Sequence, residues 1–286
     1  MPAFYCIAIA LCLAVQPCFA AEKAGLILAS NTLRQGEITR VDVLAAAEVD
    51  TVTGAFMGKA LPFIPSAQGG FYALLGVDMN TKAGTYPLVV KTWLKGKDSR
   101  TLLREITVRD AEFPVEQLTL APEKVFPDSA ARERIRGESE LRNRKWSLWS
   151  EEAYWNKRFI PPLEGELKRF GYRRIINDAP RSPHSGVDIS ADEGTPIICP
   201  ADGKVILTGD FFFSGNSVYI DHGLGLIGMF FHLSRIDVAE GDMVEQGQVL
   251  GTVGSTGRAS VPHLHWGIRY RGSRINPAAL LDLSFE

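Results

Sequence analysis

Short apolar segments that alternate with polar residues, separated by turns, run along most of this 286-residue chain. Between Ala24 and Asp110 they include "EITRVDVLAA", "TVTGAFMG", "GFYALLGVDM" and "GTYPLVVKTWLKG". Successive side chains of a strand point to opposite faces, so these segments predict strands with one buried face. Their length and spacing predict an immunoglobulin-like β-sandwich over 21–110. This region has no histidine and no polar cluster that we can connect with chemistry, which favours a spacer or binding role.

The pattern changes in the middle of the chain. Three prolines punctuate "FPVEQLTLAPEKVFPD", as is typical of a domain boundary. From Asp128 to about Trp155 the composition predicts a helix with its N-cap at Asp128 or Ser129 and a break at Gly137. Its Arg and Glu residues alternate in sign, which indicates a solvated face. We therefore assign 111–158 to a linker and helical connector. Three tryptophans are expected to pack the connector onto a neighbouring domain, namely Trp146, Trp149 and Trp155.

Strand patterns return from Phe159 onward and predict a second β domain over 159–286. This domain holds all 5 histidines of the chain, which are His184, His222, His232, His263 and His265. In "HLH" a strand would place His263 and His265 on one face, because side chains at i and i+2 point the same way. In "HSGVD", a bend at Gly186 would bring His184 and Asp188 together. Two histidines and one carboxylate form a zinc ligand set that leaves a position for water, although the spacing does not choose between the histidines of "HLH".

The first twenty residues, "MPAFYCIAIALCLAVQPCFA", have the outline of a secretory signal peptide with cleavage near Ala20. No Lys or Arg precedes the apolar run, so an uncleaved anchor stays open as the alternative. We expect an exported protein of the periplasm or cell envelope. The mature chain would keep only Cys199, whose apolar neighbours in "TPIICPADG" predict a buried residue rather than a reactive thiol.

The charge balance gives no electrostatic reason to expect a nucleic-acid partner. The chain has 31 Lys and Arg against 33 Asp and Glu, with a net charge of -2. With 45% hydrophobic and 22% charged residues it has the composition of an ordinary globular protein with room for two cores.

Motifs from about Phe159 to Leu281 resemble those of LytM and lysostaphin-type zinc metallopeptidases of metallopeptidase family 23, which cut peptidoglycan. They are "HSGVDI", "GTPI", "DGKV", "GNSVYIDHGLG", "FHLS", "VAEGDMVEQGQVLG", "GSTGRAS" and "PHLHW", in family order. The resemblance implies a mainly β chain whose last domain is a LytM-type sheet of barrel-sandwich hybrid kind (duplicated hybrid motif). It also implies Zn²⁺ bound by His184, Asp188 and His265, with His232 and His263 as catalytic histidines.

Several residues near these motifs carry further expectations. Many family members have Tyr where this chain has Phe230, so the resemblance implies the loss of a phenolic hydroxyl that could contact substrate. Val261 replaces a glycine common beside the site. His222 is expected to be structural. For Arg173 and Arg174 in "FGYRR", a substrate groove and a solvated turn both stay open.

The function expected from the resemblance is hydrolysis of peptide cross-links in peptidoglycan by zinc-activated water assisted by histidines. One alternative is an inactive relative that binds murein and activates another hydrolase, although such relatives usually lack metal ligands that this chain has. The other is a carrier domain, since "VEQGQVLGTVG" resembles turns of lipoyl domains, but no lysine stands at a hairpin tip for attachment. Which peptide bond is cut, a regulatory protein partner and the oligomeric state all stay open. A covering role of the N-terminal region over the zinc groove is a further hypothesis.

Overall fold

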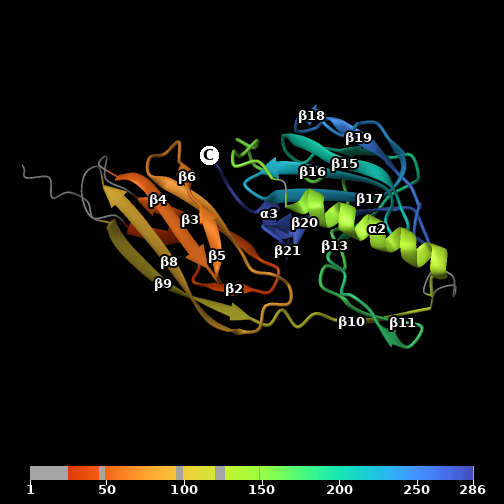
Figure 1. Cartoon of the computed structure of the whole chain (residues 1–286), viewed down its shortest axis with the longest axis horizontal. Coiled ribbons are helices and arrows are strands. Elements are labelled where there is room, and N and C mark those ends of the chain that lie inside the picture. The colour runs from red at the N-terminus through yellow and green to blue at the C-terminus, as the bar shows by residue number, and fades with distance from the viewer. Residues whose placement is uncertain (1–24, 45–48, 95–98, 120–125, 148, 286) are drawn as a thin grey trace, which may run out of the picture.

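The computed structural model describes residues 25–44, 49–94, 99–119, 126–147 and 149–285. Two β domains lie side by side, and the helix α2 (Ser129–Trp146) crosses the front of the C-terminal one (Figure 1). The predicted mainly β fold is confirmed. The signal-peptide prediction lies outside the described residues. Within the described ranges, no helix has the length and apolar character needed to cross a bilayer.

The N-terminal domain consists of two sheets that enclose a common core. Buried residues from both sheets meet there, including Val41 and Leu75 from one and Leu88 and Ile106 from the other. This is a β-sandwich, while the immunoglobulin-like connectivity stays a prediction. One sheet has the order β1 (Gly25–Leu28), β3 (Ile38–Leu44), β7 (Phe71–Gly76), β6 (Ile64–Pro65). The other has the order β2 (Thr32–Arg34), β9 (Ser99–Arg109), β8 (Gly84–Leu94), β4 (Val49–Phe56), β5 (Lys59–Pro62).

Part of the predicted linker joins the C-terminal domain as a strand. β10 (Val115–Leu118) pairs in parallel with β11 (Arg173–Ile176), which continues into β12 (Ala179–Pro180). The pattern in this short segment was too brief to predict a strand, because its pairing partner lies far along the chain. The linker is therefore bound to the domain that carries all the histidines.

Helix α2 begins where the sequence predicts it. The Asp128 carboxylate accepts the Ala131 backbone N–H at 2.8 Å, which is an N-cap contact. The predicted break at Gly137 is wrong, since the helix continues through it to Trp146. The predicted end near Trp155 is also wrong, because α2 ends at Trp146 with Ser147 as its C-cap. A glycine inside a helix costs only about 1 kcal/mol relative to alanine, and the apolar contacts of Leu141 and Trp146 with the sheet compensate for it.

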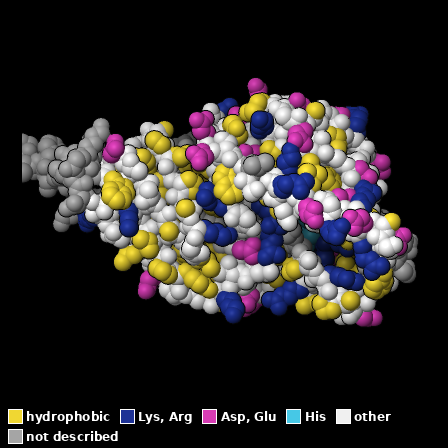
Figure 2. Space-filling view, viewed as in Figure 1, with side chains coloured by type: hydrophobic (Ala, Val, Ile, Leu, Met, Phe, Trp, Pro, Cys, Tyr) yellow, Lys and Arg dark blue, Asp and Glu magenta, His cyan; other side chains and the backbone are white. Residues whose placement is uncertain are grey.

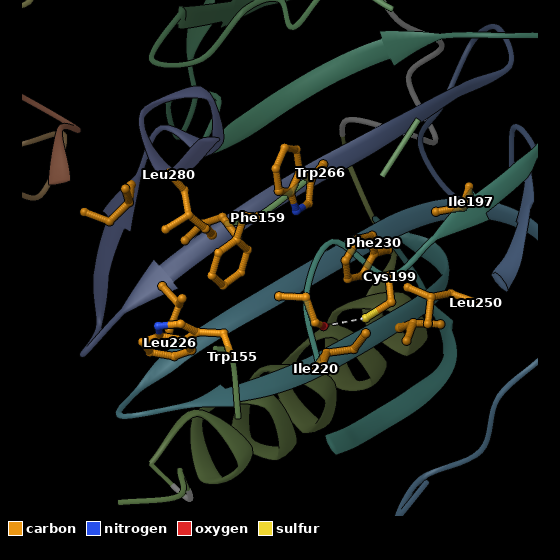
Figure 3. Packing of buried hydrophobic residues seen from close by; sticks show 14 of the residues in the cluster. Trp155, Phe159, Ile197, Cys199, Ile220, Leu226, Phe230, Leu250, Trp266 and Leu280 are labelled. Atoms are coloured by element: carbon orange, nitrogen blue, oxygen red, sulfur yellow. Dashed lines mark hydrogen bonds between the residues drawn. The ribbon is translucent and has the colours of Figure 1, made fainter. Parts of the chain in front are cut away.

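The C-terminal domain is built on an antiparallel sheet with two differently covered faces. One face packs on a large core around Trp155, Phe159, Phe230 and Trp266 (Figure 3), which confirms the packing role of Trp155. The other face lies under α2. The sheet order is β13 (Gly186–Ser190), β20 (His263–Tyr270), β17 (Leu226–Ile236), β16 (Gly215–Gly223), β15 (Gly203–Phe211), β18 (Met243–Val244). β14 (Pro196–Ile198), β19 (Val249–Val253) and β21 (Ser273–Ile275) pair beside this path, and α3 (Pro277–Leu281) follows.

Polar contacts connect the two domains. The Arg274 guanidinium forms an ion pair with Asp78 at 2.7 Å, and the Tyr270 hydroxyl donates to the Leu74 carbonyl at 2.9 Å. Tyr270 is the last residue of β20, and Arg274 lies in the following strand β21. The sandwich thus contacts the end of the strand whose beginning carries the two histidines of "HLH".

Candidate metal centre

Two neighbouring strands bring the predicted ligands together. β13 and β20 pair in antiparallel register, with Asp188 opposite His265 and Ser190 opposite His263. Cross-strand partners lie on the same face of a sheet, whereas Leu264 and Trp266 point into the core on the other face. His184 lies just before β13, where its N–H donates to the Tyr172 carbonyl at 2.9 Å. The alternation of β20 therefore presents both histidines of "HLH" to one site, as the sequence predicts.

Three donor atoms converge at this site. His184 Nε2 lies 2.8 Å from His265 Nδ1 and 3.0 Å from Asp188 Oδ1, and the last two atoms are 3.1 Å apart. Ligands of tetrahedral zinc at about 2.0–2.1 Å would be separated by about 3.3 Å. Two imidazole nitrogens and a carboxylate oxygen are also the donor types that zinc prefers. The residues present therefore fit a zinc ion.

The protonation states of the three groups suit metal binding. Burial opposes ionisation of Asp188, but its polar contacts with the His184 and His265 rings outweigh it and hold the carboxyl pKa well below its usual value. Burial lowers the pKa of His265 to about 4, so this ring is neutral at neutral pH. His184 Nδ1 lies 2.9 Å from the Arg169 carbonyl oxygen, which fixes the proton on Nδ1 and leaves Nε2 with a free lone pair.

Gly186 allows the close approach of the His265 ring. A Cβ atom on residue 186 would lie 2.6 Å from His265 Nε2 and 2.5 Å from the Trp266 carbonyl oxygen. The expected bend is not its contribution, because Gly186 is the first residue of a regular strand. Gly186 contributes by having no side chain, which leaves room for the His265 ring.

His232 and His263 stand together beside the ligand set. Their ring centroids are 4.9 Å apart, and His263 Nε2 lies 3.7 Å from Asp188 Oδ1. Each ring directs Nδ1 to a backbone carbonyl at 2.8 Å, that of Thr256 for His232 and that of Val261 for His263. Both rings therefore turn Nε2 away from these carbonyls and keep its lone pair unused by them.

A bulge in β17 presents His232 to the site. His232 has a φ of 67°, and the register with β16 shifts between Asn216 and Val218. Phe231 and His232 consequently face the same side, although consecutive strand residues normally face opposite sides. Phe231 stacks on His265 with centroids 5.2 Å apart. Burial and the neighbouring histidines lower the pKa of His232 to about 3.

The other sequence expectations have clear outcomes. Phe230 is fully buried in the core on the opposite face, so a hydroxyl there would not reach the site, and the expected loss of a substrate contact is wrong. His222 is also fully buried, with Nδ1 bonded to the Asp202 carbonyl at 2.9 Å, which confirms its structural role.

Cys199 is buried and its pKa is raised to about 12, as expected for an unreactive thiol. Val261 is exposed.

A hollow of about 300 Å³ contains the ligand set and both other histidines. Of the two arginines of "FGYRR", Arg174 lines it, and Arg173 does not. Sequence reasoning missed Arg169, which lies 3.8 Å from Asp188 Oδ2, and Arg258, which also lines the hollow. Arg169 belongs to none of the quoted motifs, and Arg258 stands in "GSTGRAS", for which the sequence alone predicts no chemical role.

Comparison with known proteins assigns the family. The sequence profile of Peptidase family M23 matches residues 182–277. The crystal structure of a Pseudomonas aeruginosa protein described as a peptidase M23 shares 31% identity, with 86% of this chain and 94% of that chain covered and a TM-score of 0.65. This chain belongs to peptidase family M23. The resemblance inferred from its motifs is confirmed.

Curated relatives of this M23 member align over part of its length. One is the DD-carboxypeptidase/endopeptidase Mpg of Neisseria meningitidis, 42% identical over 39% of this chain and 26% of the relative. Another is the peptidoglycan DD-endopeptidase ShyA of Vibrio cholerae, 40% identical over 33% of this chain and 22% of the relative. The chain spans about a quarter of the length of these relatives.

Proposed function

We propose that this chain is an exported, zinc-dependent endopeptidase that hydrolyses the peptide cross-links of bacterial peptidoglycan. The observation that carries the proposal is the convergence of His184 Nε2, Asp188 Oδ1 and His265 Nδ1 within 3.1 Å of one another. The names of the aligned relatives, which include a peptidoglycan DD-endopeptidase, support this substrate. Export rests on the apolar pattern of residues 1–20.

His184, Asp188 and His265 would hold the zinc ion, which when bound polarises a carbonyl group and lowers the pKa of water. The protein itself supplies two further imidazoles on one side of this set, His232 and His263. Each has its Nδ1 proton committed to a backbone carbonyl, so Nε2 is the atom that can accept a proton from water. The protonated ring can then deliver that proton to the leaving amine. No carboxylate other than Asp188 lines the described part of this hollow, so the acid-base work falls to imidazole.

The rival function, a murein-binding activator without activity of its own, is less well supported. A binder has no chemical need for three converging donors, nor for two more histidines with their Nδ1 atoms fixed. His232 is a non-glycine residue with a left-handed backbone, and such strain is typical of active sites. It therefore favours the enzyme over the binder.

The experiment is digestion of purified cross-linked muropeptides with zinc-loaded protein, followed by mass spectrometry. His263→Ala and a chelated sample are the inactive controls, and His222→Asn, altered at the structural histidine, is the matched active control. Loss of cross-linked dimers with the wild type and the His222 variant alone is the expected result, and the product masses identify the bond. Binding of murein and zinc without cleavage would favour the activator.

A further inference from the structure

A second hollow, of about 570 Å³, adjoins the metal centre beneath helix α2. The two hollows share Ser214, Phe231 and Arg258 among their lining residues, so they form one continuous groove. On this face Lys and Arg side chains gather between α2 and the β10–β11 segment (Figure 2). Among the described residues that line the second hollow there is no Asp or Glu, but there are five arginines, namely Arg132, Arg142, Arg181, Arg258 and Arg269.

The positive charge of this hollow is poorly compensated from within the protein. Burial, followed by repulsion from Arg174 and Arg181, lowers the pKa of Arg258. Arg142 lies 3.7 Å from Glu138, but that carboxylate also pairs with Arg134 at 2.7 Å. Partly buried charges are normally paired, so a cluster of this kind is unfavourable unless an anion completes it.

Two buried donors in the same hollow also lack acceptors. The Arg269 guanidinium stacks on the Trp146 ring, with its Cζ 4.1 Å from the ring centroid. Its Nε and the indole Nε1 of Trp146 are buried, and neither has a hydrogen-bond partner in the described part of the chain. Unsatisfied buried donors are costly, and the two side chains that carry them line this hollow, where a ligand would bring oxygen acceptors beside them.

The position of Arg269 relates this hollow to the metal centre. His265 and Arg269 are four residues apart on β20 and therefore lie on the same face of the sheet, about 13 Å apart along the strand. An extended peptide covers that distance with about four residues. A peptide with its scissile bond at the metal centre can thus reach the arginines beneath α2.

We propose that the hollow beneath α2 is a subsite for free carboxylate groups of the peptide substrate, on one side of the bond that is cut. Guanidinium groups bind carboxylates through paired, charge-assisted hydrogen bonds, which gives both affinity and orientation. The subsite selects peptides that carry free carboxylates over the same peptides with amidated carboxylates. This inference rests on the proposed function, because it takes the peptide substrate from there.

The test measures binding to the metal-free protein by calorimetry, with a four-residue peptide that bears two free carboxylates and with its diamide. The wild type is expected to bind the free acid about tenfold more tightly than the diamide. Arg269→Gln should remove most of that preference. Arg132→Gln should reduce it about threefold, and because Arg132 is exposed on α2 this variant keeps the fold. Arg136→Gln is the matched control, since Arg136 lies on the same helix, pairs with Glu133 at 2.6 Å and does not line the hollow.

Three results would overturn the inference. They are equal binding of acid and diamide, equal losses in the Arg132 and Arg136 variants, and binding of a glycerol phosphate oligomer without binding of the peptide. The proposed function is judged separately by cleavage of cross-linked muropeptides with zinc. A carboxylate preference without any cleavage would contradict the function alone, and cleavage without a preference would contradict this subsite alone.

Discussion

Replacing Gly186 with alanine tests whether the close packing of β13 on β20 positions the ligand His265. The new Cβ would lie 2.5 Å from the Trp266 carbonyl oxygen and 2.6 Å from His265 Nε2. Ordinary contacts of this kind are about 3.5 Å, so the strands must separate or the His265 ring must move by about an ångström. Overpacking of this kind costs about 1–3 kcal/mol of unfolding free energy. Moving a ligand from its position should weaken zinc binding by about tenfold to a hundredfold.

The assay has two parts, urea unfolding of the metal-free protein and competition for zinc with a chromophoric chelator. Gly186→Ala should lose stability in the first and affinity in the second. Gly137→Ala is the control, because its added Cβ has nothing within 4 Å, so it should lose neither stability nor zinc affinity. A Gly186→Ala protein with wild-type stability and zinc affinity within threefold of wild type would refute the reasoning.

Three further predictions follow from buried residues and from the helix. Burial lowers the folded-state pKa of His222 from 6.5 to about 4, so between these values the unfolded chain binds the extra proton and acidification should remove up to about 3 kcal/mol of stability. Urea titrations at pH 7 and 4.5 should show that His222→Asn loses less unfolding free energy on acidification than the wild type. An equal loss in the two proteins would contradict the lowered pKa of His222 as its cause. Phe230→Tyr should cost about 1–3 kcal/mol through a buried hydroxyl, while the hydrolysis rate stays within twofold; a faster rate would show that the hydroxyl reaches the site. Gly137→Ala should raise the unfolding free energy by about 0.5–1 kcal/mol, and a destabilised variant would mean that the helix is not regular there.

The ligand arrangement could be predicted because it depends on local periodicity. A strand over "HLHW" places His263 and His265 on one face and Trp266 on the other, as the structure shows. The short spacing of His184 and Asp188 brought the remaining donors within reach. The choice of His265 over His263 came from the family resemblance, and the geometry now gives it a basis, because Nδ1 of His265 points at the other two donors.

Other features depend on contacts between distant segments and could not be predicted. The bulge that presents His232 arises from a register shift between β16 and β17, which leaves no pattern in the sequence. The same register shift explains why the sequence predicts Phe230 beside the site, whereas the structure has Phe231 there. The arginine-lined groove exists because α2 lies across the sheet, and the alternating charges of the helix predicted only a solvated face.

Anomalous diffraction at the zinc edge from crystals grown with zinc tests the central claim most directly. The account predicts a single strong peak per chain, about 2.0–2.2 Å from His184 Nε2, Asp188 Oδ1 and His265 Nδ1. A peak held by His263 in place of His265, or no peak at these three residues, would contradict it.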